Sequence, residues 1–110
     1  MGKIRTYSRY NIEAVILLGK QIRLGRKQRK WTEVELAQRA GISLSTVKRL
    51  EKGDMTCAVG LVFEVALLVG IKLFGSDGHH IETLKERIED KIALLPKTIR
   101  NIQKELDDDF

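Results

Sequence analysis

The segment from Gly41 to Gly53, GISLSTVKRLEKG, concentrates hydroxyl and basic side chains in a short stretch of the chain. It contains three hydroxyls, three cations and a single leucine among the hydroxyls, namely Ser43, Ser45, Thr46, Lys48, Arg49, Lys52 and Leu44. Such groups hydrogen-bond to base edges and phosphates, and a guanidinium can pair with guanine through two donors. An ordinary capped surface helix has a similar composition, so the segment has two readings: a groove-facing helix or a solvated one.

The distribution of charge favours a polyanion-binding face. Residues 1–53 carry 13 Lys/Arg against 4 Asp/Glu, a net charge of +9, whereas residues 54–110 carry 7 against 11, a net charge of −4. A basic half joined to an acidic half indicates a surface for an acidic partner and a separate body or tail. The apolar fraction of 43% suits a globular protein.

Composition also bounds the compartment. The single cysteine, Cys57, fits a reducing compartment, and we expect it to be a small buried hydrophobe. The apolar runs are too short for a membrane span, and the start of the chain lacks the pattern of a signal peptide. We therefore expect a cytoplasmic protein.

Hydrophobic periodicity and capping residues predict five helices and no sheet, over residues 11–29, 32–40, 44–51, 58–69 and 80–94. Asn11 is expected to cap the first, with Glu13 in its first turn, and Thr32 with Glu35 forms a capping box at the second. Ser43 caps the third. Gly41 and Gly53 end the second and third helices. The helix over 58–69 is apolar nearly all round, which predicts burial in the core or at an interface.

Two side-chain groups complete these elements. Four cations of the first helix, Arg23, Arg26, Lys27 and Lys30, recur at the spacing of one helix face, where they either attract a nucleic-acid backbone or form a solvated face. Apolar contacts are expected from Ile12, Val15, Leu18, Ile22, Val34, Leu36, Ala37 and Ala40, and core or interface positions from Trp31, Phe63 and Phe74.

Two short helices joined by a tight turn at residues 41–43 make a helix-turn-helix. The stretch ELAQRAGISLSTVKRLEKG resembles the motif of the Xre/Cro/C1-type helix-turn-helix regulators, and the resemblance extends over about residues 18–71. It implies an all-α, five-helix, lambda-repressor-like DNA-binding domain. It also implies that the third helix lies in the major groove, commonly in a dimer bound to a near-palindrome.

The resemblance assigns roles by position. Leu44, Ser45 and Arg49 match base-reading positions, and Arg49 can pair with a guanine while Leu44 can contact a thymine methyl. The remaining DNA-contact candidates are Thr32, Ser43, Thr46, Lys48 and Lys52. Arg26 and Glu51 match positions that often form an ion pair between the first and third helices.

Glu33 departs from the family, where glutamine is frequent at that position. A carboxylate facing a phosphate is unfavourable, so we expect Glu33 to turn away or to pair with Arg29 or Lys30.

The domain organisation expected from these patterns has four parts: an N-terminal arm (1–10), the helix-turn-helix domain (11–75), a C-terminal helix suited to dimerisation (76–95) and a polar, acidic-ended tail (96–110). We expect a homodimeric repressor that binds a double-stranded operator. The alternative is an antitoxin that binds a HipA-like kinase toxin and represses its own operon. The opening RTYSRY, the segment EKGDMTCAVGLVFEVALLVGIKLF and the ending ALLPK…DDDF resemble such HipB-like regulators.

Catalysis is not expected, because no nucleophile, paired carboxylate or glycine-rich phosphate loop stands out in the sequence. His79 and His80 are adjacent, without further ligands at metal-binding spacing, so we expect neither a metal nor a cofactor.

Overall fold

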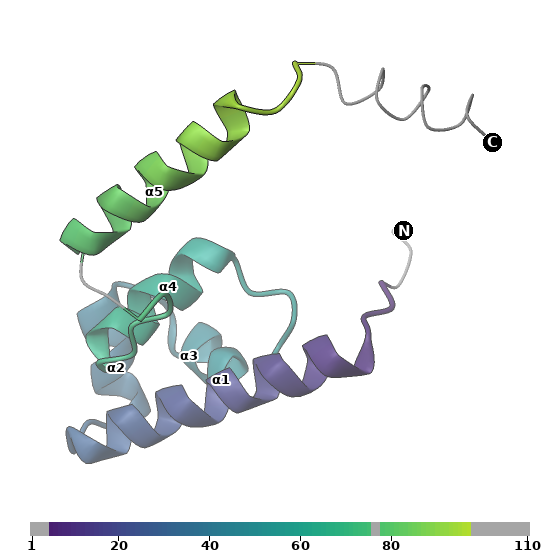
Figure 1. Ribbon diagram of the computed structural model, residues 1–110. Helices are drawn as coiled ribbons and strands as arrows, with labels where there is room; N and C mark the ends of the chain where they lie inside the picture. Colours follow the sequence, from purple (N-terminus) through teal and green to yellow (C-terminus); the bar gives the residue numbers. More distant parts are fainter. Residues whose placement is uncertain (1–4, 76–77, 98–110) are drawn as a thin grey trace. The chain divides into compact units, whose positions relative to one another are not determined.

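A computed structural model describes residues 5–75 and 78–97, and its regular elements there are all helices, as the sequence predicts. The helices are α1 (Arg9–Gln28), α2 (Glu33–Ala40), α3 (Leu44–Glu51), α4 (Val59–Leu68) and α5 (Gly78–Ala93), shown in Figure 1. Contacts divide the chain into two compact units, Met1–Leu73 and Phe74–Phe110. The unit of α1–α4 and the unit of α5 are therefore described separately.

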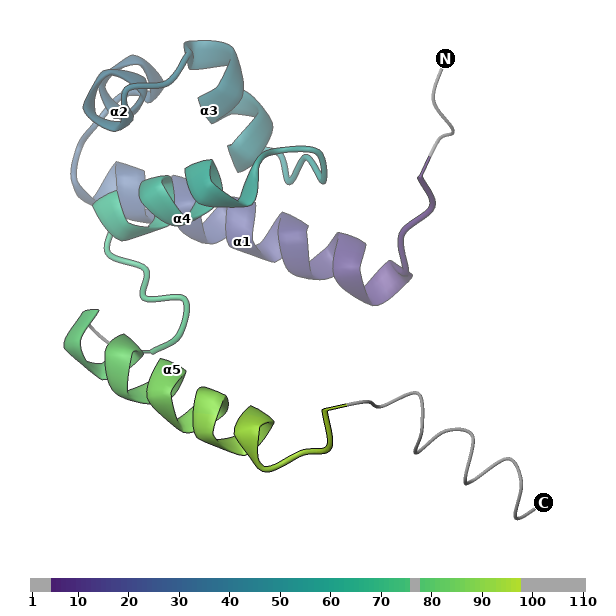
Figure 2. The same ribbon diagram turned by 90° about the horizontal axis from the view of Figure 1, so that it is seen from above.

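Side-chain caps set the start of α2 and α3 as the sequence predicts. The Thr32 hydroxyl accepts from the Glu35 amide at 3.1 Å, and the Glu35 carboxylate accepts from the Thr32 amide at 3.4 Å. The Ser43 hydroxyl accepts from the amide of Thr46 at 3.1 Å. Gly41 ends α2 in the left-handed conformation, at a φ of 68°, which glycine adopts without a steric penalty. The two helices lie at a steep angle to each other, with α2 seen nearly end-on in Figure 2.

The first helix differs from the prediction at both ends. Its N-cap is Ser8, whose hydroxyl accepts from the amide of Asn11 at 3.3 Å, so the prediction that Asn11 caps the helix is wrong. Since Ser8 is as good a cap as asparagine, the helix begins two residues earlier and Glu13 lies beyond its first turn. At the other end α1 stops at Gln28, one residue before the predicted end, and Lys30 then adopts a φ of 60°.

The four predicted stripe cations therefore do not share one face. Arg26 is only 8% exposed and faces the protein, whereas Arg23 and Lys27 are exposed on α1. Lys30 has left the helix at the turn toward α2. Helical spacing alone cannot tell which members of a basic stripe point inward.

The core of the first unit is formed by small and aliphatic side chains from α1 to α4 and the residue after α4: Ile22, Leu36, Ala37, Val47, Leu50, Val65 and Val69. Leu18, Trp31, Ala40, Ile42 and Cys57 are among the partly buried residues packed against it. Two expected contributors are more exposed than predicted, since Val34 is 48% and Ile12 is 39% exposed. Both lie near the first turn of a helix, where the helical pattern continues beyond the packed region.

The apolar helix α4 is buried on one side only. Val65 and Ala66 are buried in the first unit, whereas Val59 is 70% and Leu67 is 67% exposed. Phe63 on α4 and Phe74 in the second unit are also largely accessible. The prediction that α4 lies in the core or at an interface is therefore confirmed in part, because one side of α4 lies in the core. The other side of α4 is exposed and has the composition of an interface.

Close helix packing depends on Gly19 in the middle of α1. A Cβ atom at this position would lie 2.6 Å from the carbonyl oxygen of Leu50 and 2.8 Å from that of Glu51. Both atoms belong to the backbone of α3, so a side chain at Gly19 would have to push the two helices apart.

Replacing Gly19 by alanine is expected to lower the free energy of unfolding by about 1–3 kcal/mol, the usual cost of overpacking a well-packed site. Thermal and urea unfolding followed by circular dichroism would measure this loss. Gly60→Ala in α4 is the matched control, because a Cβ there meets no atom within 4 Å. Equal stability of the two variants would contradict the close approach of α1 and α3.

Candidate functional site

The ion pair expected between Arg26 and Glu51 is formed and links α1 to α3. Nε of Arg26 donates to Oε2 of Glu51 at 2.7 Å, and Nη2 donates to Oε1 at 2.9 Å. The third nitrogen, Nη1, donates to the carbonyl oxygen of Trp31 at 2.9 Å. The two side chains are only 9% and 5% exposed, and the hydrogen bonding of Arg26 to the Glu51 carboxylate raises the pKa of Arg26. The pair therefore fixes the C-terminal end of α3 relative to α1.

Hydroxyls at the start of α3 are bound to one another. The Ser43 hydroxyl, which caps the helix, lies 2.8 Å from the Thr46 hydroxyl and 3.1 Å from the Ser45 hydroxyl. Ser43 and Ser45 are exposed, and Leu44 and Thr46 are partly exposed, but the hydroxyls of Ser43 and Thr46 are engaged in the cap. Ser43 and Thr46 support the geometry of the helix start.

A hollow of about 240 Å³ lies between α1, α2 and α3. Its lining comprises Arg23, Arg26, Glu33, Lys48, Glu51 and Lys52. Since Arg26 and Glu51 neutralise each other, the remaining charges are three cations and the carboxylate of Glu33. A surplus of accessible cations suits an anionic group such as a phosphate.

One of the two cations expected as partners of Glu33, Arg29, binds elsewhere. Nη1 of Arg29 donates to the carbonyl oxygen of Val69 at 2.8 Å and to that of Gly25 at 3.3 Å. Among the described residues, Glu33 forms no ion pair with Arg29 or Lys30, so this one of the two expected alternatives is wrong. Arg29 instead ties the end of α1 to the residue after α4, and Glu33 remains at the hollow.

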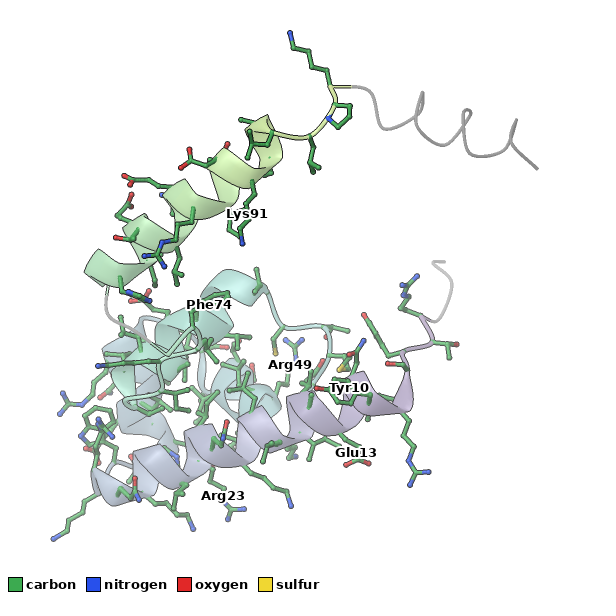
Figure 3. The ribbon with its side chains drawn as sticks, in the orientation of Figure 1. Tyr10, Glu13, Arg23, Arg49, Phe74 and Lys91 are labelled. Atoms are coloured by element: carbon green, nitrogen blue, oxygen red, sulfur yellow. The ribbon has the colours of Figure 1, made fainter. Side chains whose placement is uncertain are left out.

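Arg49 belongs to a hydrogen-bonded cluster that the sequence analysis missed. Its Nε donates to Oδ2 of Asp54 at 2.9 Å, and its Nη2 donates to the hydroxyl oxygen of Thr56 at 2.8 Å. The hydrogen bond to Asp54 raises the pKa of Arg49. Hydrogen bonds to the Asp54 carboxylate, from Thr56 first and from Arg49 second, hold the pKa of Asp54 well below its usual range. Figure 3 labels Arg49. The signal was the Asp-x-Thr spacing directly after the Gly53 helix end.

The other predicted site residues are placed as follows. Thr32 is exposed at the N-terminus of α2, and its hydroxyl is engaged in the capping box with Glu35. Lys48 and Lys52 are exposed and line the hollow. The structure thus brings Arg23, Lys48 and Lys52 together and places the Arg49 cluster at the end of α3.

Cys57 is partly buried against the core, and burial raises the pKa of its thiol. This agrees with the expectation of a small hydrophobe rather than a reactive thiol. Over the described parts of the chain, no three His, Cys, Asp or Glu side chains gather as a metal site would require. In those same ranges no helix has the length and apolar character needed to cross a membrane.

Comparison with known protein families gives a match to the segment that contains the hollow and the Arg49 cluster. The model of the helix-turn-helix family matches residues 22–73, which span the end of α1, all of α2, α3 and α4, and the hollow. A search of curated proteins found no match. The tail over 98–110 lies outside the described residues, and the antitoxin alternative stays a prediction.

Breaking the Arg26–Glu51 pair is expected to destabilise the domain. Arg26→Met leaves the carboxylate of Glu51 buried without its partner, which costs roughly 3–5 kcal/mol in comparable pairs. Chemical denaturation would measure the loss. The double variant Arg26→Met/Glu51→Leu removes both charges and is expected to recover much of it. A single-variant cost below about 1 kcal/mol, the range of surface pairs, would contradict a structural role.

Proposed function

Because the chain is a DNA-binding transcriptional regulator with a helix-turn-helix domain of the Xre/Cro/C1 type over residues 22–73, we propose that it is a homodimeric repressor that reads operator DNA with α3. The observation that carries this proposal is the arrangement of α3. Its inner side chains, Val47 and Leu50, are buried, while Ser45, Lys48 and Arg49 are exposed. A helix held in this way can enter a major groove with its outer side chains toward the bases.

The cations beside α3 support a division of roles between residues that bind DNA phosphates and residues that read bases. Arg23, Lys48 and Lys52 line the hollow next to α3, and such cations suit phosphates, which position a protein on DNA without reading sequence. Leu44 and Ser45 offer a methyl contact and a weakly selective hydroxyl. Arg49 is the group suited to strong hydrogen-bonded discrimination. A half-site read by so few groups gains specificity from dimer spacing and DNA shape.

The second unit offers a surface for the dimer. Ile81, Leu84, Ile88, Ile92 and Leu95 recur at helical spacing. Several of them remain largely exposed, with Ile88 at 54%, Ile92 at 55% and Leu95 at 60%. Within this unit, Phe74, Ile81, Leu84, Lys85, Ile88 and Glu89 line a hollow of about 480 Å³. A single helix with such an apolar face needs a partner to be stable.

The pattern of α5 suits a second copy of itself in an antiparallel arrangement. Ile88 lies midway between Ile81 and Leu95, so centring two helices on Ile88 matches apolar side chains along both. Lys85 then faces Glu89 of the other copy, and the same pair recurs by symmetry. Lys85 also pairs with Glu82 at 3.1 Å on its own helix, but both side chains are exposed and such a bond is weak.

Selection of bound sequences from a random DNA library is expected to yield a near-palindromic motif with half-sites about 34 Å apart. Arg49→Ala is expected to relax specificity at one guanine by about 1–3 kcal/mol, and Leu44→Ala to relax it at one thymine. Lys48→Ala is the contrasting variant: it should keep the motif and reduce the slope of log affinity against log salt by about one. Failure to select any motif at low salt would contradict the proposal.

Charge exchange on α5 tests the proposed dimer. Lys85→Glu is expected to weaken self-association by placing like charges opposite each other, whereas Lys85→Glu/Glu89→Lys restores opposite charges and should recover it. Analytical ultracentrifugation measures the dissociation constant of each variant. Ile88→Ser, which removes the central apolar contact, should give monomers. An unchanged dimer in all three variants would place the interface elsewhere.

A further inference from the structure

We propose that Asp54 and Thr56 are positioning residues that hold Arg49 in the orientation needed to pair with a guanine. The inference rests on the proposed role of α3 in DNA reading and adds two residues outside the helix. Neither Asp54 nor Thr56 needs to touch a base. They act by occupying one edge of the guanidinium and thereby selecting the edge that faces the DNA.

The two edges of the guanidinium are not equivalent in this structure. The side edge, made by Nε and Nη2, is occupied by Asp54 Oδ2 at 2.9 Å and by the Thr56 hydroxyl at 2.8 Å. The end edge is made by Nη1 and the second N–H of Nη2, and it has no hydrogen bond within the described residues. Since a guanidinium is planar and its donors are fixed in a fork, fixing one edge also orients the other. Two parallel donors on that edge match O6 and N7 of guanine.

The chemistry of the cluster allows only one pattern of hydrogen bonds. Oδ1 of Asp54 accepts from the amide of Thr56 at 2.7 Å and from its hydroxyl at 2.5 Å. The single hydroxyl proton of Thr56 is thereby used, so its oxygen acts as acceptor toward Arg49. An ionised carboxylate, which only accepts, satisfies all of these donors. Asparagine would direct an N–H₂ group at one of them.

The backbone places Asp54 beside Arg49. Gly53 has a φ of 80°, and its amide donates to the carbonyl oxygen of Leu50 at 3.1 Å. The amide of Asp54 donates to the carbonyl oxygen of Arg49 at 3.0 Å. These two bonds form the Schellman motif that ends α3. A Cβ atom at Gly53 would also lie 2.8 Å from Cα of Ile16, so the turn is packed against α1.

The ion pairing of Arg49 distinguishes its proposed role from that of the lysines on either side, which attract phosphates. Asp54 neutralises Arg49 locally, whereas Lys48 and Lys52 have no ion pair within the described part of the chain. Arg49 is still 46% exposed. The side chain of Arg49 is therefore already ordered before it contacts DNA. This order makes its contact directional and reduces the rotamer freedom lost on binding. The flanking lysines supply the salt-dependent attraction.

The experiment compares wild type with Asp54→Asn, Thr56→Val and Thr56→Ser on the DNA motif selected by wild type. The probe is 7-deazaguanine, which lacks N7, placed at the guanine whose preference Arg49→Ala abolishes. Wild type and Thr56→Ser, which keeps the hydroxyl, are expected to bind the modified site about tenfold more weakly than the normal one. Asp54→Asn and Thr56→Val are expected to lose most of this difference. Thermal unfolding checks that the four proteins are equally folded.

Binding to unrelated DNA distinguishes positioning from a change in charge or stability. Thr56→Val leaves the charge unchanged, so its non-specific affinity and salt slope should equal those of wild type. Asp54→Asn removes a negative charge and should bind non-specific DNA somewhat more tightly. Guanine discrimination that is lost while non-specific affinity is kept supports the proposal.

Three results would overturn it. If wild type selects a motif but both variants discriminate the modified guanine as wild type does, the positioning role is excluded and the proposed function stands. If Asp54→Asn binds the selected motif more tightly and still fully discriminates the modified guanine, then Asp54 restrains Arg49 from binding DNA instead of positioning it. If wild type selects no motif, the proposed function fails and the positioning role fails with it.

Discussion

The bidentate bond between Arg26 and Glu51 is the constraint on which the rest of the domain depends. It joins the last turn of α1 to the last residue of α3, and a third nitrogen of Arg26 secures the turn before α2 through the Trp31 carbonyl. Charges this well buried are stable only when each is paired. The orientation of α3, and hence of every side chain that it exposes, is therefore coupled to α1 through one buried contact beside the close approach at Gly19.

Around this constraint, adjacent residues of α3 have separate tasks. Ser43 caps the helix and binds the Thr46 hydroxyl, while Val47 and Leu50 are buried in the core. Ser45, Lys48 and Arg49 are exposed, and these are the positions that we propose for recognition. The helix end adds a further task, because the turn at Gly53 that terminates α3 also carries Asp54 to Arg49. The same short loop thus ends α3 and holds the side chain of Arg49.

The sequence predicts local features of this domain well and side-chain direction poorly. Caps at Thr32 and Ser43, the glycine at position 41 and the bounds of α3 follow from short-range rules, and the structure contains all of them. The start of α1 was missed because Ser8 and Asn11 both satisfy the same rule. Arg29 and Asp54 were missed for another reason: their partners are set by tertiary packing and by a turn, which periodicity does not describe.

Affinity cleavage distinguishes whether α3 lies in the major groove of bound DNA, as we propose. Ser45→Cys in a Cys57→Ala background gives a single attachment point for an iron chelate on the exposed side of α3. If α3 lies in the major groove, cleavage is confined to each half-site of the selected motif and has the strand offset typical of a major-groove origin. Cleavage outside the half-sites, or with a minor-groove offset, would contradict it.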